Sequence, residues 1–190
     1  MFGIDEAIFR ALHGENPQSL LTYLSLLLTA VGSGFTTLVA IPLLLRARTR
    51  PFIAELVLVV LVVAVVVFAV KAGVGRTRPY LSLPHVHALY MMFQPPTDHS
   101  FPSGHAAGSF STATFLVFRF PGQLGVRSRV GLFALATAIG LSRIYLGVHY
   151  PSDVASGALL GFAFGAAFGV GFRRRAARLA EASHETRSSL

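Results

Sequence analysis

Long uninterrupted runs of apolar residues alternate with short polar segments along this chain of 190 residues. These runs follow neither the two-residue period of a half-buried strand nor the 3.6-residue period of an amphipathic helix. A helix that is apolar on nearly every face is either buried inside a large protein or spans a lipid bilayer. The pattern predicts an all-α fold with six such helices, at residues 18–32, 34–46, 52–74, 103–119, 129–149 and 153–172.

The run at residues 52–74 is the clearest of the six. Its sequence, "FIAELVLVVLVVAVVVFAVKAGV", would extend roughly 34 Å as a helix, which is enough to cross a bilayer core. A chain of this length is too small to bury several such helices inside itself, so we expect a polytopic membrane protein. The first two runs are short and are separated only by "GSG" at residues 32–34. They could form one kinked segment, which would give five spans.

The two ends of the chain differ from these runs. Residues 4–12 place Ile4, Ile8, Phe9 and Leu12 on one helical face, which predicts a short interfacial helix on the membrane surface. No basic segment followed by an apolar core occurs at the N-terminus, so no cleaved signal peptide is expected. We expect one membrane-embedded domain at residues 1–175, followed by a polar cytoplasmic tail at residues 176–190.

Composition supports the membrane interpretation. Hydrophobic residues make up 53% of the chain and charged residues 13%, which is about half the charged share of an ordinary globular protein. There is no cysteine, which excludes disulfides and thiolate metal sites. A net charge of +8 would suggest a nucleic-acid partner in a soluble protein. The placement of the basic residues explains the charge differently, and we expect no nucleic acid to bind.

Basic residues are concentrated on one side of the six-span arrangement. The positive-inside rule makes this the cytoplasmic side of the cell membrane, where the C-terminus would also lie. The net charge is then a topology signal that also attracts anionic lipid head groups. The residues on this side are Arg10, Arg46, Arg48, Arg50, Arg119, Arg127, Arg129, Arg173, Arg174, Arg175, Arg178 and Arg187.

The remaining basic residues are predicted on the opposite, extracytoplasmic side. They are Lys71, Arg76, Arg78 and Arg143. With either number of spans, the loops at residues 75–102 and 147–153 lie on the same side, because the two helices between them form a hairpin. His105, His149 and Asp153 are therefore expected at the same membrane face as these cations.

Lys71 and Arg78 belong to the stretch "KAGVGRTRP" at the end of the third run. Taken alone, each could be a snorkelling cation that anchors a helix end. Together they could clamp an anion, because arginine offers two parallel donors to a phosphate and lysine adds a mobile point charge.

The stretch "FPSGHAAGSFSTATF" begins the fourth predicted helix. Ser103 is a suitable N-cap, so the helix would start at Gly104 and His105. A helix N-terminus favours an anion, and glycine lets a ligand approach the backbone closely. A plain cap would need no histidine, which favours an anion site over a purely structural cap.

The stretch "SRIYLGVHYPSD" carries Arg143, His149 and Asp153 at the edge of a hydrophobic run. A carboxylate near the histidine could bind one ring nitrogen and leave the other free to attack. Arg143 precedes His149 by six residues, about 240° around a regular helix, so the two would not share a face. We therefore expect the helix to end before His149, or the arginine to bend inward.

Three cations, two histidines and one carboxylate at one face form the outline of a phosphate-ester site. The cations would neutralise the phosphoryl oxygens, where positioning and electrostatics supply most of the catalysis. One histidine would attack phosphorus and the other would protonate the leaving oxygen. No cluster of carboxylates is present in the sequence that could hold a pair of metal ions, so we expect no metal and no other cofactor.

The three stretches resemble the three motifs of the type 2 phosphatidic acid phosphatase family, which shares its site with vanadium haloperoxidases. The resemblance implies a bundle of six membrane helices with the site at the extracytoplasmic face. It covers residues 71–153, through Lys71 with Arg78-Pro79, Pro102-Ser103-Gly104-His105, and Ser142-Arg143 with His149 and Asp153 at the motif spacing.

The resemblance also implies a role for each matched residue. His149 would be the nucleophile that forms a phosphohistidine, and Asp153 would orient it. His105 would be the general acid, and would then activate water. Arg76 is not a motif position and is left out of the predicted site. The phosphate-binding positions would be Lys71, Arg78, Ser103, Gly104 and Arg143.

The resemblance leaves the substrate open. Members act on phosphatidate, phosphatidylglycerol phosphate, polyprenyl pyrophosphates, sphingolipid phosphates and lipid A. A small six-span chain looks most like the bacterial members that recycle polyprenyl pyrophosphate carriers or dephosphorylate glycerophospholipids. Met91, Met92 and Phe93 could contact the lipid chain or pack on neighbouring helices. Two alternatives are a phosphotransferase that uses an acceptor other than water and a transporter that only binds the lipid phosphate.

Overall fold

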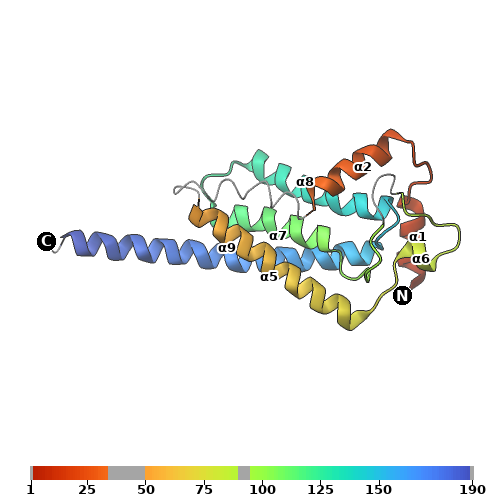
Figure 1. Cartoon of the computed structure of the whole chain (residues 1–190). Helices are drawn as coiled ribbons and strands as arrows, with labels where there is room; N and C mark the ends of the chain where they lie inside the picture. The colour runs from red at the N-terminus through yellow and green to blue at the C-terminus, as the bar shows by residue number, and fades with distance from the viewer. Residues whose placement is uncertain (1, 34–49, 90–94, 189–190) are drawn as a thin grey trace.

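The computed structural model describes residues 2–33, 50–89 and 95–188. These residues contain helices and no strand, which confirms the predicted all-α fold class (Figure 1). The helices are α1 (Phe2–Leu12), α2 (Leu20–Val31), α5 (Arg50–Val74), α6 (Pro79–Ser82), α7 (Gly104–Arg119), α8 (Val126–Tyr145) and α9 (Pro151–Ser188).

The long helices lie side by side in a bundle, with α1 and α6 at one end (Figure 1). The starts of α7 and α9 and the end of α8 lie at that same end, as does the C-terminal end of α5. Two segments, Pro51–Ser82 and Pro151–Thr186, are long and apolar enough to cross a membrane. α2 has 12 residues, about 18 Å, and is too short to cross a bilayer core alone.

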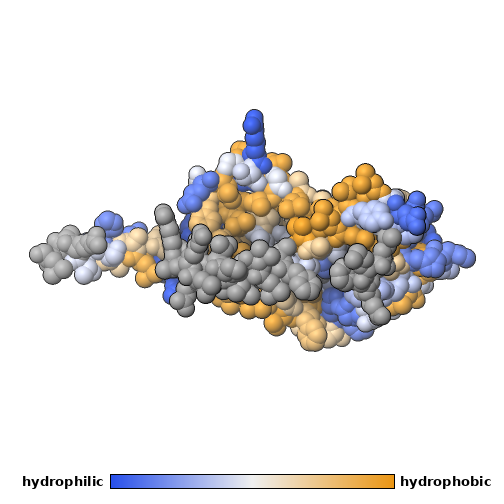
Figure 2. Space-filling view, turned by 45° about the horizontal axis from the view of Figure 1, so that its top comes forward, coloured by the Kyte–Doolittle hydropathy of each residue, from blue (hydrophilic) through white to orange (hydrophobic). Residues whose placement is uncertain are grey.

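Large apolar side chains point outward from the bundle (Figure 2). Phe68 of α5 is 74% exposed and Leu159 of α9 is 73% exposed. A soluble monomer rarely exposes contiguous apolar surface of this kind. This outward-facing apolar surface is what a helix bundle needs where it contacts lipid.

A column of glycines on α9 permits its close packing against α7. A side chain at any of these glycines would overlap backbone atoms of α7, including the carbonyl oxygens of residues 103, 107, 111 and 115. The helices therefore touch along their backbones, as small residues allow in membrane bundles. The glycines are Gly157, Gly161, Gly165 and Gly169.

α8 ends at Tyr145, four residues before the predicted end of the fifth span. Gly147 has a φ of +81°, a left-handed conformation that ends a helix readily when glycine adopts it. The backbone N–H of His149 donates to the carbonyl of Arg143 at 3.3 Å. The helix thus ends before His149, as expected from the phase difference between these two residues.

The predicted N-terminal helix is present as α1, but only part of its apolar face is exposed. Ile4, Ile8 and Leu12 are exposed, whereas Phe9 is fully buried. Its ring packs against Tyr150, with the two centroids 5.7 Å apart. α1 is therefore docked on the connection between α8 and α9.

This docking corrects the predicted side of Arg10. The six-span arrangement places Arg10 opposite the site, but α1 lies at the site end of the bundle (Figure 1), where the buried Phe9 holds it. The alternative in which residues 18–46 form one segment gives the observed placement. The second predicted span, 34–46, and the pair Met91 and Met92 with Phe93 lie outside the described residues. The number of spans stays a prediction.

α9 continues well beyond the predicted sixth span, which ends at residue 172. The helix runs without interruption through Arg173 to Ser188. Residues 176–188 of the predicted tail are thus helical and continue α9.

We predict that Gly161→Ala destabilises the protein, because the added methyl group would overlap the carbonyl of Ala107. Overpacking of this kind costs about 1–3 kcal/mol. The matched control is Gly171→Ala on the same helix, where the methyl group meets nothing within 4 Å. Alanine favours a helix over glycine by about 1 kcal/mol, so the control should be neutral or slightly stabilising. Thermal unfolding in detergent measures both, and equal shifts would contradict the packing argument.

Candidate active site

All eight predicted site residues fall within the described residues, at the end of the bundle that holds α1 and α6 (Figure 1). Each lies at a helix terminus or in a connection, where side chains and free backbone groups can converge. Their places are the last turn of α5 (Lys71), the N-cap of α6 (Arg78), the N-cap and first turn of α7 (Ser103, Gly104, His105), the last turn of α8 (Arg143), the α8–α9 connection (His149) and the first turn of α9 (Asp153).

The N-termini of α7 and α9 are joined directly. Ser103 accepts a hydrogen bond from the backbone of Ala106, as the predicted N-cap does. Its own N–H donates to the carbonyl of Asp153 at 2.9 Å. The two helix N-termini therefore lie side by side, and each favours a negative charge nearby.

Lys71 and Arg78 form a cationic cluster that is bridged by Asp98. The Lys71 amine donates to Asp98 Oδ2 at 2.5 Å, and Arg78 donates to Asp98 Oδ1 at 2.6 Å. Burial raises the pKa of Asp98, but the hydrogen bonds from these two cations outweigh it and lower the pKa to about 2. A substrate phosphate that used the same donors would have to displace this carboxylate.

Arg78 also contacts His149 and reveals its tautomer. A guanidinium N–H of Arg78 lies 3.2 Å from His149 Nε2. Because arginine can only donate, Nε2 carries a lone pair and Nδ1 carries the proton. Nδ1 lies 3.5 Å from Asp153 Oδ2, which is longer than a hydrogen bond. The carboxylate is therefore close to the ring nitrogen that lies away from Arg78, but the predicted hydrogen bond between them is not formed.

The surroundings of His149 keep its imidazole neutral. The residue lies in the α8–α9 connection and is buried. Burial lowers the pKa of His149 well below its usual value, and the positive charges of Arg78 and Arg143 lower it further. A neutral imidazole has the lone pair that a nucleophile requires.

Arg143 and His105 complete the predicted set. Arg143 is buried and donates to the hydroxyl of Thr29 in α2 at 3.0 Å. His105 Nε2 is buried and has no hydrogen-bond partner among the described residues. Burial and the positive charges of Arg143, Arg78 and Lys71 all disfavour a positive charge on the ring of His105. The structure thus brings together the predicted residues of all three motifs.

Two charged residues outside the predicted set bind to members of it, namely Arg76 and Asp98. Arg76 donates to Asp153 Oδ1 at 2.7 Å. It was left out because it is not a motif position, although it was already one of few basic residues predicted on the site side. The sequence contained one indication of Asp98, because few acidic residues occur in the predicted spans and loops and buried cations need acidic partners.

The described residues include no group of three His, Asp or Glu side chains placed to hold a metal ion. The side chains that converge here are mostly cations and histidines, which suit an anion.

We predict that Asp98→Asn strengthens the binding of inorganic phosphate about two- to five-fold, because a competing carboxylate is removed. Asp98 is 57% exposed, so a modest effect is expected. The control is Glu55→Gln, which removes a carboxylate paired with Arg119 instead. Protection against thermal unfolding by phosphate measures the affinity. Unchanged or weaker binding in Asp98→Asn would show that the carboxylate does not compete.

Known proteins share both sequence and fold with this chain. The bacitracin transport permease protein BcrC of Bacillus licheniformis is 42% identical over 106 residues, which cover 52% of this chain and 48% of that protein. The undecaprenyl-diphosphatase of Sulfolobus acidocaldarius is 34% identical over 119 residues, 63% of this chain and 54% of that protein. The chain therefore spans about half the length of these curated relatives.

The crystal structure of Aquifex aeolicus LpxE has the same fold, with a TM-score of 0.74 and 30% sequence identity. The superposition covers 87% of this chain and 94% of that one. The sequence profile of the PAP2 superfamily matches residues 52–176, a range that contains all three motifs. The chain belongs to the PAP2 superfamily, which confirms the resemblance found in its motifs.

Proposed function

We propose that this protein is a membrane phosphatase that hydrolyses the phosphate monoester or pyrophosphate of a lipid through a phosphohistidine intermediate. The observation that carries the proposal is the environment of His149. Its Nε2 lone pair lies beside Arg78 of the cationic cluster, and its Nδ1 faces the carboxylate of Asp153. This is the arrangement of a nucleophile, a phosphate clamp and an orienting group.

In the first step, His149 Nε2 attacks phosphorus, a P–N bond forms, and the bond from phosphorus to the leaving oxygen breaks. Lys71, Arg78 and Arg143 neutralise the phosphoryl oxygens together with the N-terminus of α7 at Ser103 and Gly104. His105 takes up a proton once the negative charge of the bound substrate offsets the neighbouring cations, and it gives this proton to the leaving oxygen. Asp153 stabilises the positive charge that the ring of His149 acquires.

In the second step, His105 takes a proton from water, and the resulting hydroxide attacks phosphorus. The P–N bond breaks, phosphate leaves, and His149 is restored with its lone pair. No metal ion is needed in either step, since the cations of the chain supply the positive charge. A phosphotransferase would differ only in the second step, where another acceptor would replace water.

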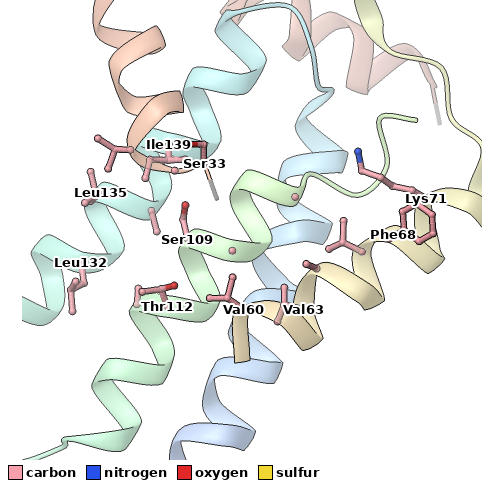
Figure 3. Close-up of a pocket in the computed structure, with 18 of the residues that line it drawn as sticks. Ser33, Val60, Val63, Phe68, Lys71, Ser109, Thr112, Leu132, Leu135 and Ile139 are labelled. Carbon is pink, nitrogen blue, oxygen red and sulfur yellow. The ribbon is translucent and has the colours of Figure 1, made fainter. Parts of the chain in front are cut away.

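An apolar cavity of about 500 Å³ supports a lipid substrate. It lies between α5, α7 and α8, and Figure 3 shows Lys71 at one end of it. A cavity of this size is typical of a ligand pocket. A lipid could place its phosphate beside Lys71 and its hydrocarbon chain among Val63, Ser109 and Leu135.

The Sulfolobus relative supports a lipid substrate over a soluble one, because it is an undecaprenyl-diphosphatase. The Bacillus relative carries the name of a transport permease, which is the one observation that favours a transporter. A transporter would leave its substrate chemically unchanged and would not need a buried histidine beside a buried aspartate.

We place the site at the extracytoplasmic face of the cell membrane. Arg173, Arg174 and Arg175 of α9 lie about 30 Å along the helix from Asp153, and positive residues favour the cytoplasmic side. The C-terminus would then be cytoplasmic.

We predict that the purified protein releases phosphate from lipid phosphates or pyrophosphates in the presence of a metal chelator. His149→Ala should abolish this release, because it removes the ring nitrogen that would form the phosphoryl intermediate. The matched control is His184→Ala, at an exposed position near the end of α9, which should retain full activity. Phosphate release and the transfer of labelled phosphate to other acceptors are measured together. Full activity in His149→Ala would refute the mechanism.

We also predict that Thr112→Phe raises KM for long-chain substrates, because the ring would fill part of the cavity that Thr112 lines. KM for a lipid phosphate with a very short chain should change little. Val130→Phe is the control, since Val130 is exposed on α8 and does not line the cavity. An equal change in KM for long and short chains would argue against the cavity as the chain site.

A further inference from the structure

We propose that Arg76 is a positioning residue for Asp153, and that Asp5 of α1 holds Arg76 in its place. The contacts then run in series from Asp5 to Arg76, from Arg76 to Asp153, and from Asp153 to His149. The inference rests on the proposed function, because Asp153 acts there through His149.

The contacts of Asp153 leave its carboxylate one orientation. Oδ1 accepts a hydrogen bond from Arg76 at 2.7 Å, and Oδ2 accepts one from the backbone N–H of Tyr150 at 2.8 Å. Oδ2 is also the oxygen that faces His149 Nδ1. Because each oxygen has its own donor, the carboxylate cannot rotate without breaking a bond. Arg76 therefore keeps Oδ2 directed at the nucleophile.

Arg76 is itself held by Asp5 from a distant part of the sequence. Its second terminal nitrogen donates to Asp5 Oδ2 at 2.6 Å. The side chains of Arg76 and Asp5 are only 15% and 13% exposed, so solvent weakens this pair less than a surface pair. The guanidinium thus bridges two carboxylates, which fixes its plane.

Asp5 also contacts the first turn of α9. Its Oδ1 accepts the backbone N–H of Ser152 at 2.9 Å, one of the helix N-terminal donors that have no partner within the helix. Burial raises the pKa of Asp5, but hydrogen bonds from Ser152 and Arg76 outweigh it and lower the pKa. Asp5 is therefore ionised at neutral pH and acts as the cap of α9, supplied by another helix.

Packing fixes the position from which Asp5 acts. Phe9, one helical turn after Asp5, is fully buried and contacts Tyr150. The guanidinium carbon of Arg76 lies 4.0 Å from the centre of the Tyr150 ring. α1 thus covers the connection that carries His149 and brings Asp5 to the start of α9.

The charges explain why Asp5 is needed in addition to Arg76. If Asp153 were its only acidic contact, the Arg76 guanidinium would neutralise that carboxylate. Asp153 would then interact more weakly with a positive His149 ring. Asp5 supplies a second negative charge to the same guanidinium. Arg76 can then orient Asp153 while Asp153 keeps its ability to stabilise the imidazolium.

The test compares kcat and KM for phosphate release in the full-length protein. We expect Asp5→Asn and Arg76→Gln to lower kcat about 10- to 100-fold, as is common for groups that orient a catalytic residue. KM should stay unchanged, because neither residue belongs to the phosphate clamp. Arg76→Lys should retain more activity than Arg76→Gln. The controls are Glu6→Gln and Arg10→Gln, a surface pair on the same helix, and both should behave like the wild type.

A double variant tests whether the residues act in series. Asp5→Asn combined with Arg76→Gln should have the kcat of Arg76→Gln alone, because the asparagine keeps an oxygen that can accept from Ser152 and loses only the charge that acts on Arg76. Multiplied losses would overturn this order of action.

Each other outcome also decides the inference. An active wild type with unchanged kcat in both single variants overturns the inference alone, and so does a raised KM at constant kcat. A loss of kcat that only parallels a loss of thermal stability would mark a structural role and overturn it too. If Arg76→Gln does not fold, Asp5→Asn carries the test, since it keeps the pair of Arg76 and Asp153. A wild type that releases no phosphate overturns the proposed function and this inference with it.

Discussion

The arrangement of the site depends on the backbone contact between α7 and α9. Glycines on α9 let its axis approach α7 so closely that Ser103 donates directly to the carbonyl of Asp153. This contact fixes the distance between the helix end that carries His105 and the connection that carries His149. The geometry therefore follows from the absence of side chains along one helix face as much as from the polar residues.

The sequence carries enough information to predict the helices and most of the site. Apolar runs predict α5 and α9, and the parity of the spans places Lys71 and His149 at one end without knowledge of the fold. The angular difference between Arg143 and His149 correctly predicts a helix end, which Gly147 provides. These inferences succeed because they rely on local patterns and on the alternation of sides in a membrane.

The placement of α1 could not be predicted in the same way. Nothing local distinguishes Phe9 from the other apolar residues of its helix, although it is the one that is buried. The contact of Asp5 with Arg76 joins residues 71 positions apart. Such a contact exists only because of tertiary docking, so neither spacing nor a motif reveals it. Arg10 was predicted on the wrong side for the same reason, because its side was derived from the six-span arrangement, which takes no account of how α1 packs.

In the proposed membrane arrangement, the unbroken course of α9 sets the depth of the site in the bilayer. The helix has 38 residues, about 57 Å, whereas the hydrocarbon core is about 30 Å thick. Asp153 lies in its first turn, and Arg173 lies 20 residues later, a rise of about 30 Å that matches this thickness. Arginines at that height can anchor in one layer of lipid phosphates. In the proposed arrangement, α9 thus fixes the distance between these arginines and Asp153. Asp153 then lies level with the head groups of the other leaflet, where a lipid substrate would present its phosphate.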